Sequence, residues 1–258
     1  CRDRPRKPSC PVTSFPRYTT LTPFSAPPVL CYNSRMIRRV HILVNQKIPG
    51  IENQKRRVER IIRETGAMLE PAPGPETDLI VTLGGDGILL KGVHLAQRDD
   101  ALIMGVNFGR VGFLTEPADD LEDRIACVLQ GTAPLSKRMG LDVAFPGEHH
   151  EFCLNEVFLF RKGIRIVTLT IARNGEPCMR LRCDGAIIAT PTGSSAHALA
   201  AGGPLLHPQA HAILIVPVNP FTLAWRPTVL PPDDRLSVTA DGECCVICDG
   251  QREGSLAP

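Results

Sequence analysis

The stretch that decides the fold is DLIVTLGGDGILLKGVHLA, residues 78–96. Its mostly apolar beginning, 78–83, predicts a buried strand, and the apolar residues of 88–96 predict a helix. Between them lies the turn Gly84-Gly85-Asp86-Gly87. A glycine-rich turn that leads from a strand into a helix lets backbone N–H groups approach a phosphate. The stretch therefore predicts a phosphate-binding strand–turn–helix unit.

The aspartate inside this turn has two interpretations. A carboxylate repels phosphate unless it has another task, and Asp86 could bind a metal or take a proton from an attacking hydroxyl, as the aspartate of a kinase does. Alternatively, Asp86 caps a helix that starts near Ile88. The turn alone leaves both interpretations open.

The segments around this unit extend the same pattern. Strand-like apolar runs alternate with segments whose apolar residues recur at helical spacing. The expected strands are at 38–44 and 101–106, and the expected helices are at 51–65 and 121–129. Because strands that alternate with helices form a parallel sheet, we expect an α/β, Rossmann-like N-terminal domain over residues 36–134.

The pattern changes after residue 134, where the helical spacing fades. Asn174-Gly175 predicts a tight hairpin turn. Strand-like runs occupy residues 164–171, 186–189, 213–218 and 235–240. We therefore expect a mostly antiparallel, β-rich C-terminal domain over residues 135–258.

Residues 1–35 differ from the rest of the chain. They carry seven prolines, several arginines and a single acid, Asp3. Such a segment buries little apolar surface, so we expect it to be disordered. It could also be an artefactual extension ahead of a native start at Met36.

Composition limits the partners and the compartment. The formal net charge of +2 predicts no nucleic-acid or anionic-membrane partner, and no apolar run approaches the roughly 20 residues that span a bilayer. Ten cysteines without a signal peptide predict a reducing, cytoplasmic compartment. The cluster Cys244-Cys245-x-x-Cys248 has no second Cys/His pair at matching spacing, so we expect a strand or turn there and no metal site.

A second loop is rich in small polar residues. Residues 189–197, ATPTGSSAH, follow Asp184-Gly185 and precede Gly202-Gly203-Pro204. Four hydroxyls and a glycine lie within six residues, 190–195, next to a strand end. A solvated Ser/Thr turn would have a similar composition, but the flanking glycines favour a loop that binds phosphate oxygens through hydroxyl and backbone donors.

The pair Asn155-Glu156 lies between apolar residues. A carboxylate can accept two hydrogen bonds from a ribose diol, and an asparagine can bind an amide or a base edge. Without further context, an exposed polar step in a strand explains the pair equally well.

Taken together, these motifs resemble the NAD kinase family. The resemblance is carried by the Gly84–Gly87 turn, Gly105-Val106-Asn107-Phe108-Gly109, Gly112-Phe113-Leu114, Asn155-Glu156, and residues 190–196 with 201–204. Gly-Gly-Asp-Gly also occurs in diacylglycerol-kinase-like and phosphofructokinase-like enzymes. The Asn-Glu pair and the long Thr-Pro-Thr-Gly loop separate NAD kinases from those relatives.

The resemblance implies transfer of the γ-phosphate of ATP, or of inorganic polyphosphate, to the 2′-hydroxyl of the adenosine ribose of NAD. A divalent metal, Mg²⁺ or Mn²⁺, would accompany the donor. Asp86 would be the general base, and Gly85 and Gly87 would border the diphosphate. A homodimer or homotetramer is also implied.

The resemblance further implies a set of residues that bind NAD. In order along the chain these are Asn155, Glu156, Arg182, Asp184, Thr192, Ser195, Ala196 and His197. Asp184 would contact the nicotinamide half, and Ser195 and Ala196 would line the adenine site. His197 stands where the family usually has tyrosine, and either ring can stack on the nucleotide.

Three features depart from the family pattern. Ile88 stands where threonine is usual, and Asn219-Pro220-Phe221 replaces a usual Pro-His step. The sequence ends at Pro258, where family members continue, so we expect a truncated C-terminal domain. These departures leave two alternatives to an NAD kinase: a non-catalytic dinucleotide-binding module, or a related kinase of a lipid or sphingoid base.

Overall fold

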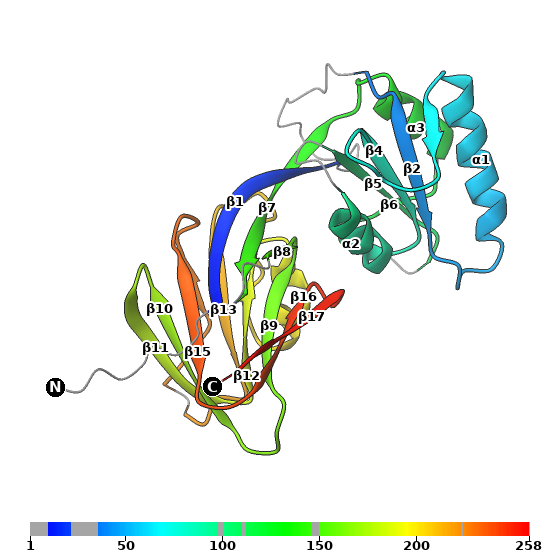
Figure 1. Cartoon of the computed structure of the whole chain (residues 1–258). Coiled ribbons are helices and arrows are strands. Elements are labelled where there is room, and N and C mark those ends of the chain that lie inside the picture. Colours follow the sequence, from blue (N-terminus) through cyan, green and yellow to red (C-terminus); the bar gives the residue numbers. More distant parts are fainter. Residues whose placement is uncertain are drawn as a thin grey trace. The chain divides into compact units, whose positions relative to one another are not determined.

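The computed structural model describes residues 10–21, 36–96, 101–109, 112–145, 150–222 and 224–257, and for 10–21 the backbone only. The chain forms two compact units, which are described one at a time (Figure 1). We call Arg17–Arg138 the N-terminal unit, and Met139–Pro258 with Cys1–Pro16 the C-terminal unit. The division falls between Arg138 and Met139, inside strand β7 (Leu135–Ala144).

The N-terminal unit is an α/β layer structure. Its parallel sheet has the order β3-β2-β4-β5, with β6 parallel to β5. The strands are β2 (Arg39–Val44), β3 (Met68–Glu70), β4 (Leu79–Leu83), β5 (Leu102–Asn107) and β6 (Glu116–Pro117). The helices are α1 (Ile51–Glu64), α2 (Asp86–Leu95) and α3 (Leu121–Leu129). The expected Rossmann-like arrangement of strands and helices is confirmed.

Helices cover both faces of this sheet. The apolar residues of α1 and α3 share one core with Leu79, Val81 and Leu83 of β4. Helix α2 packs on the opposite face, where Gly92 lies against the methyl group of Thr82. Because alternate residues of a strand point to opposite faces, a strand buried on both faces is apolar throughout, as β4 is except for Thr82.

One strand lies in the segment for which we expected disorder. β1 (Cys10–Leu21) pairs antiparallel with β15 through residues 10–12 and parallel with β5 through Thr19 and Thr20. The expectation of disorder weighed the prolines and not the β-branched and aromatic residues between them, which favour strands. Residues 1–9 and 22–35 lie outside the described residues.

The C-terminal unit is built from antiparallel strands, which confirms the β-rich prediction. One group contains β7, β8 (His150–Cys153), β10 (Val167–Arg173), β11 (Glu176–Cys183) and β15 (Leu236–Ala240). The other sheet has the order β14-β13-β12-β9-β16-β17. Its strands are β9 (Glu156–Arg161), β12 (Gly185–Ala189), β13 (Ile213–Val218), β14 (Thr228–Leu230), β16 (Cys244–Cys248) and β17 (Arg252–Leu256).

Local features of this unit follow the sequence closely. Asn174 and Gly175 have φ values of 52° and 91° and connect β10 to β11, so the expected hairpin turn is confirmed. Strand β12 is buried along its whole length because it faces an apolar core on each side. Cys244 and Cys248 lie buried in strand β16, as the strand interpretation of the cysteine cluster predicted.

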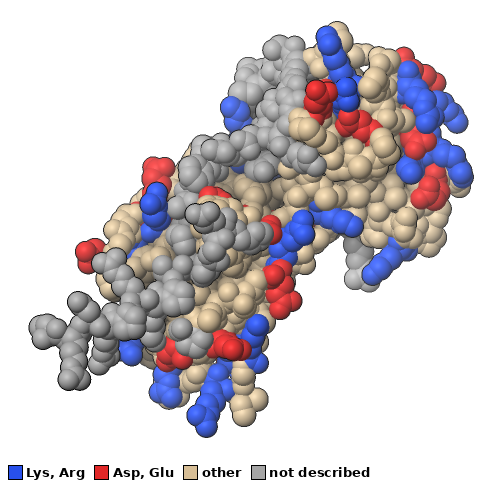
Figure 2. All heavy atoms as spheres, in the orientation of Figure 1, with Lys and Arg blue, Asp and Glu red and all other residues tan. Residues whose placement is uncertain are grey.

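No helix in the described part of the chain is long and apolar enough to span a bilayer. On the face shown in Figure 2, basic and acidic side chains lie interspersed.

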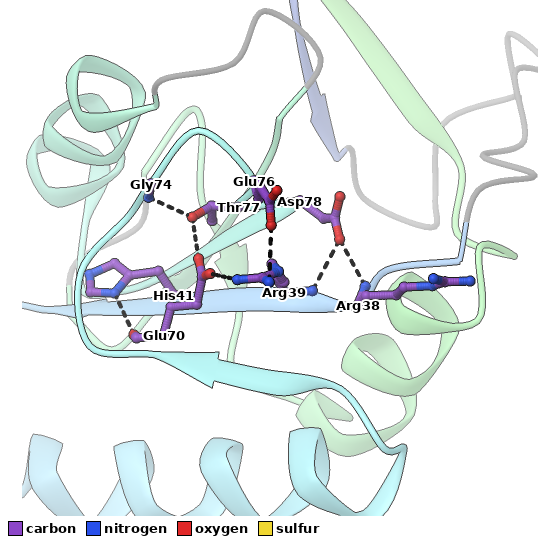
Figure 3. A network of polar contacts seen from close by, with 8 residues as sticks. All are labelled: Arg38, Arg39, His41, Glu70, Gly74, Glu76, Thr77 and Asp78. Carbon is purple, nitrogen blue, oxygen red and sulfur yellow. Dashed lines mark hydrogen bonds and ion pairs between the residues drawn. The ribbon is translucent and has the colours of Figure 1, made fainter.

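A polar network fixes the connection that leads into β4. The carboxylate of Asp78, immediately before the strand, accepts hydrogen bonds from the backbone N–H groups of Arg38 and Arg39 at 2.9 and 3.0 Å. Figure 3 shows how these residues lie along the start of β2. The network therefore joins the starts of two neighbouring strands whose opposite ends lead toward the glycine-rich turn.

Thr77, which is buried, and Glu70, which is half-buried, belong to the same network. Thr77 donates to Glu70 and accepts the N–H of Gly74 at 2.7 Å, and Arg39 donates to Glu70 at 2.9 Å. Burial acts to raise the pKa of Glu70, but the hydrogen bonds from Thr77 and Arg39 outweigh it and hold this pKa below its usual value.

We expect Thr77→Val to lower the free energy of unfolding by about 1–3 kcal/mol, because the N–H of Gly74 and the carboxylate of Glu70 each lose a partner. Urea denaturation measures the change. Thr132→Val is the matched control, since its exposed hydroxyl can be replaced by water, and its effect should be within about 0.5 kcal/mol. Equal losses in the two variants would contradict the assignment.

Candidate functional site

Asp86 lies at the N-terminus of α2, at the carboxyl end of β4. The helix begins at Asp86 itself, its N-cap residue is Gly85, and no side chain caps it. Instead, the Asp86 carboxylate accepts hydrogen bonds from the backbone N–H groups of Phe113 at 2.8 Å and Leu114 at 3.2 Å, and from Thr115 Oγ1 at 2.9 Å. The helix-cap interpretation of Asp86 is therefore wrong, because its oxygens are turned away from the helix and toward this loop.

The loop beside Asp86 leaves the carboxylate partly available. A carboxylate has about four acceptor positions, and the described residues occupy three of them at Asp86. A Cβ atom at Gly112 would lie 2.8 Å from Asp86 Cγ and 2.6 Å from Thr115 Oγ1. Glycine at position 112 is therefore what lets the loop close on the carboxylate.

Ile88 takes part in packing of the turn. Gly84 has a φ of 156°, and a Cβ built on it would lie 2.7 Å from Ile88 Cγ2. The isoleucine side chain thus leans back over Gly84 from the first turn of α2. The threonine that we expected from the family pattern would add a hydroxyl at this point, and Ile88 adds only an apolar contact.

In the C-terminal unit, three strand ends meet at one edge of a sheet. Strand β9 lies between β12 and β16, and Glu156 at its start pairs with Ala189 at the end of β12. On the other side, Val157 pairs with Cys248 at the end of β16. The antiparallel register therefore places Asn155-Glu156, the loop after Ala189 and the turn after Cys248 together.

Asp249, in that turn, holds the backbone of the Asn-Glu pair. Its carboxylate accepts the N–H groups of Leu154 and Asn155 at 2.7 Å each and of Glu156 at 3.0 Å. Its own N–H donates to the carbonyl of Glu156 at 3.0 Å. Asp249 is 4% exposed and has a φ of 50°. It fixes three successive residues and is the residue of this site that our sequence analysis missed.

The loop after β12 closes over the same backbone. Thr190 Oγ1 donates to the carbonyl of Leu154 at 2.6 Å, and the N–H of Thr190 donates to the carbonyl of Asn155 at 2.8 Å. A Cβ atom at Gly193 would collide with that Asn155 carbonyl. Ser194 Oγ donates a hydrogen bond to the carbonyl of Pro191 at 2.6 Å. The hydroxyls of Thr190, Ser194 and Ser195 therefore bond backbone carbonyls of this region. Phosphate binding by the loop stays a prediction.

Three polar atoms of this region have no partner among the described residues. They are Asn155 Oδ1, Glu156 Oε2 and Thr192 Oγ1, and each is buried. A buried polar atom without a hydrogen bond costs about 1–3 kcal/mol, so native proteins rarely leave several together. Asn155 and Glu156 are adjacent in the chain, and Gly193, next to Thr192, lies against the Asn155 backbone. This cluster of three residues is therefore the candidate ligand site of the C-terminal unit.

His197 contacts the same cluster. Its Nδ1 lies 2.7 Å from Glu156 Oε1, and its ring centroid lies 6.1 Å from that of Phe158. Burial raises the pKa of Glu156, while the hydrogen bond from His197 acts to lower it. The predicted residues Asn155, Glu156, Thr192 and His197 are thus brought together, and Ser195 and Ala196 connect two of them.

Arg182, near the end of β11, and Asp184, between β11 and β12, lie near the start of β12, away from the loop after Ala189. Asp184 accepts hydrogen bonds from Arg161 Nε at 2.5 Å and Asn219 Nδ2 at 3.0 Å. The bond from Asn219, followed by that from Arg161, lowers the pKa of Asp184. The Arg182 guanidinium lies 4.8 Å from the ring centroid of Phe221. The structure therefore separates this pair from the Asn155 cluster by the length of a strand, and the unusual residues Asn219 and Phe221 contact it.

The described residues hold no group of three or more His, Cys, Asp or Glu side chains suited to a metal ion.

Comparison with known proteins identifies the family. Residues 29–130 match the model of the ATP-NAD kinase N-terminal domain, and residues 154–258 match that of the ATP-NAD kinase C-terminal domain. An NAD kinase of Pseudomonas putida (strain W619) is 36% identical over 225 residues, which cover 79% of this chain and 76% of that protein. This chain belongs to the NAD kinase family.

Other members of the NAD kinase family are similar over shorter shares of their length. The NAD kinase of Thermobifida fusca is 38% identical over 76% of this chain, and that of Gemmatimonas aurantiaca is 42% identical over 67%. The chain spans 66% and 64% of the length of these two relatives. Membership of the NAD kinase family does not favour the alternative of a lipid or sphingoid-base kinase.

Solved structures show the same fold. An NAD kinase from Archaeoglobus fulgidus in complex with ATP matches with a TM-score of 0.72 and 27% identity, over 85% of this chain and 87% of that one. A yeast NADH kinase complexed with NADH matches in fold with a TM-score of 0.78 and 23% identity, over 93% and 85% of the two chains.

We expect Asp249→Asn to lower the free energy of unfolding by about 3 kcal/mol. The amide has one acceptor oxygen, and its nitrogen only donates, so at least one of the three buried N–H groups loses its partner. Urea denaturation measures it. Asp233→Asn is the control, since Asp233 is exposed, and it should leave the unfolding midpoint nearly unchanged. A midpoint for Asp249→Asn equal to that of the control would refute the role of Asp249.

Proposed function

We propose that this protein is an NAD kinase that transfers a phosphoryl group from ATP to the 2′-hydroxyl of the adenosine ribose of NAD, yielding NADP and ADP. The observation that carries the proposal is the buried cluster of unpartnered atoms on Asn155, Glu156 and Thr192, in a chain that belongs to the NAD kinase family.

The chemistry of this cluster favours a ribose or a base over a phosphate. Asn155 Oδ1 and Glu156 Oε2 are acceptors, and the carboxylate of Glu156 cannot donate. A ligand that satisfies them must offer O–H or N–H groups, as a ribose diol or an adenine amino group does. A phosphate would meet the Glu156 carboxylate with like charge. We therefore assign a nucleoside part of NAD to this cluster and not its diphosphate.

Asp86 would act as the general base. Its carboxylate is held in place by the N–H groups of Phe113 and Leu114 and by Thr115, with acceptor capacity left for one more donor. That donor would be the ribose 2′-hydroxyl, which transfers its proton to Asp86 as its oxygen bonds to the γ-phosphorus and the bond to the ADP oxygen breaks. A base of modest strength suffices because such enzymes act mainly by positioning.

The donor phosphates would bring their own metal. ATP binds Mg²⁺ largely through phosphate oxygens and water, so the protein need not supply a full set of ligands. The N-terminal turn of α2, with Gly85 and Gly87, offers backbone N–H groups to the phosphates. ATP or polyphosphate as donor, a cytoplasmic location and a homodimeric or homotetrameric state remain predictions.

We expect Asp86→Asn to lower kcat for NADP formation by about 100-fold or more, because the amide cannot take the hydroxyl proton. NAD, ATP and magnesium are mixed with the protein, and NADP is read by a coupled NADP-specific dehydrogenase. NAD binding, measured by calorimetry, should persist in the variant. Equal rates for the wild type and the variant would refute catalysis by Asp86. NAD binding without any NADP in the wild type would favour the non-catalytic module.

We expect Gly112→Ala to lower kcat by about 10- to 100-fold, because the new methyl group pushes against Asp86 and Thr115 and displaces the base. Gly109→Ala is the matched control in the same loop region, where among the described residues a Cβ would meet only Asn107 Oδ1, at 3.7 Å. The control should retain its rate. Similar rates in both variants would show that closure of the loop on Asp86 is not required.

A further inference from the structure

His197 is placed over the strand that carries Glu156. It is the first residue of α4 (His197–Ala200), and Ala198 packs on Ile187 and Ala189 of β12 together with Phe158 of β9. Glu156 and Phe158 are two residues apart in β9 and share that face of the sheet. The His197 ring, tilted by 42° to the ring of Phe158, therefore lies beside the Glu156 carboxylate.

The two oxygens of this carboxylate have different surroundings. Oε1 lies 2.7 Å from His197 Nδ1, whereas Oε2 is buried and has no partner among the described residues. An ionised Glu156 carboxylate can only accept hydrogen bonds, so in that state the hydrogen of this bond belongs to Nδ1. The backbone of Glu156 is already held by Asp249. The hydrogen bond to His197 fixes the direction of the Glu156 side chain, which the backbone contacts do not determine.

We propose that His197 is a positioning residue, whose Nδ1–H donates to Oε1 of Glu156 and holds the side chain, so that Oε2 is presented as an acceptor to a hydroxyl or amino group of the dinucleotide. This inference rests on the proposed binding of NAD by the C-terminal unit. It gives His197 a role distinct from ring stacking, one that a tyrosine or phenylalanine ring would not fill through the same atom.

The charges around Glu156 explain why it needs this donor. The ionisable groups that act on Glu156 are His197 from α4 and Asp249 from the turn after β16. Cys153, at the end of β8, lies nearby, but burial raises its pKa so far that the thiol stays neutral where Glu156 titrates. Burial raises the pKa of Glu156 and the charge of Asp249 raises it further, while His197 lowers it. Glu156 accepts hydrogen bonds best when ionised, so its function is present above its pKa and lost as the pH falls through it. Loss of His197 would move this limit to higher pH.

The first test needs no ligand. The carboxyl ¹³C signal of Glu156, assigned with Glu156→Gln, is titrated in the wild type, His197→Phe and His197→Asn. Phenylalanine keeps a ring and removes the donor, whereas the asparagine amide reaches the place of Nδ1. We expect the Glu156 titration to move to higher pH in His197→Phe, to return most of the way in His197→Asn, and to stay unchanged in His211→Phe, an exposed control. An unchanged titration in His197→Phe would overturn the proposal.

The second test measures the binding of NAD by calorimetry and its use as a substrate by steady-state kinetics. We expect His197→Phe to weaken NAD binding about tenfold near neutral pH, which corresponds to the loss of one hydrogen bond to a charged group, with the KM for ATP unchanged. The weakening should grow as the pH falls. His197→Phe combined with Glu156→Gln should bind NAD no more weakly than Glu156→Gln alone, because both changes remove the same interaction.

The outcomes separate this proposal from the proposed function. Wild-type affinity in His197→Phe would show that the ring alone suffices, and additive losses in the double variant would show that His197 acts independently of Glu156. Either result overturns the positioning role. A wild-type protein that binds no NAD would refute the proposed function, and the titration would still decide whether His197 controls Glu156.

Discussion

The arrangement of the C-terminal unit depends on one buried carboxylate. Asp249 accepts three successive backbone N–H groups, from Leu154 to Glu156. These N–H groups precede or begin β9, where they would otherwise lack partners inside the protein, and an unpaired buried N–H is costly. By satisfying them with a charge, Asp249 fixes the segment from which Asn155 and Glu156 project. The Thr190 loop then closes on the carbonyls of that same segment.

Asp86 applies the same physical device in the N-terminal unit. Its carboxylate also gathers donors from a loop, in this case two N–H groups and one hydroxyl from residues 113–115. The two aspartates differ in how far their carboxylates are buried. Asp249 is 4% exposed and serves the backbone, whereas Asp86 is only partly buried, at the start of a helix. These hydrogen bonds fix both the loop and the carboxylate. A fixed carboxylate suits the general base that we propose, because phosphoryl transfer depends on positioning.

Much of the fold was predictable because local pattern and tertiary role agree. Strand β4 and helices α1 and α3 were found at nearly their observed bounds, because their apolar spacing reflects which faces are buried. Two features differ from the expectation. Helix α2 begins at Asp86, two residues before Ile88, which is within the usual uncertainty of a helix end. Strand β1 was missed because its pairing partners lie far away in sequence.

The sequence by itself determined the alternation of strands and helices in the N-terminal unit, the β-rich character of the C-terminal unit and the motifs of the candidate site, because these follow from apolar spacing, turn residues and the pattern that the family shares. Only the tertiary structure decided which polar atoms are spent on the fold and which remain for a ligand. Thr190 and Thr192 are alike in sequence, yet one hydroxyl builds the loop and the other has no partner among the described residues. Asp249 gave no signal, since Asp-Gly reads as an ordinary turn. The reason is that hydrogen-bond satisfaction depends on groups brought together by the register of β9, β12 and β16, and not on neighbours along the chain.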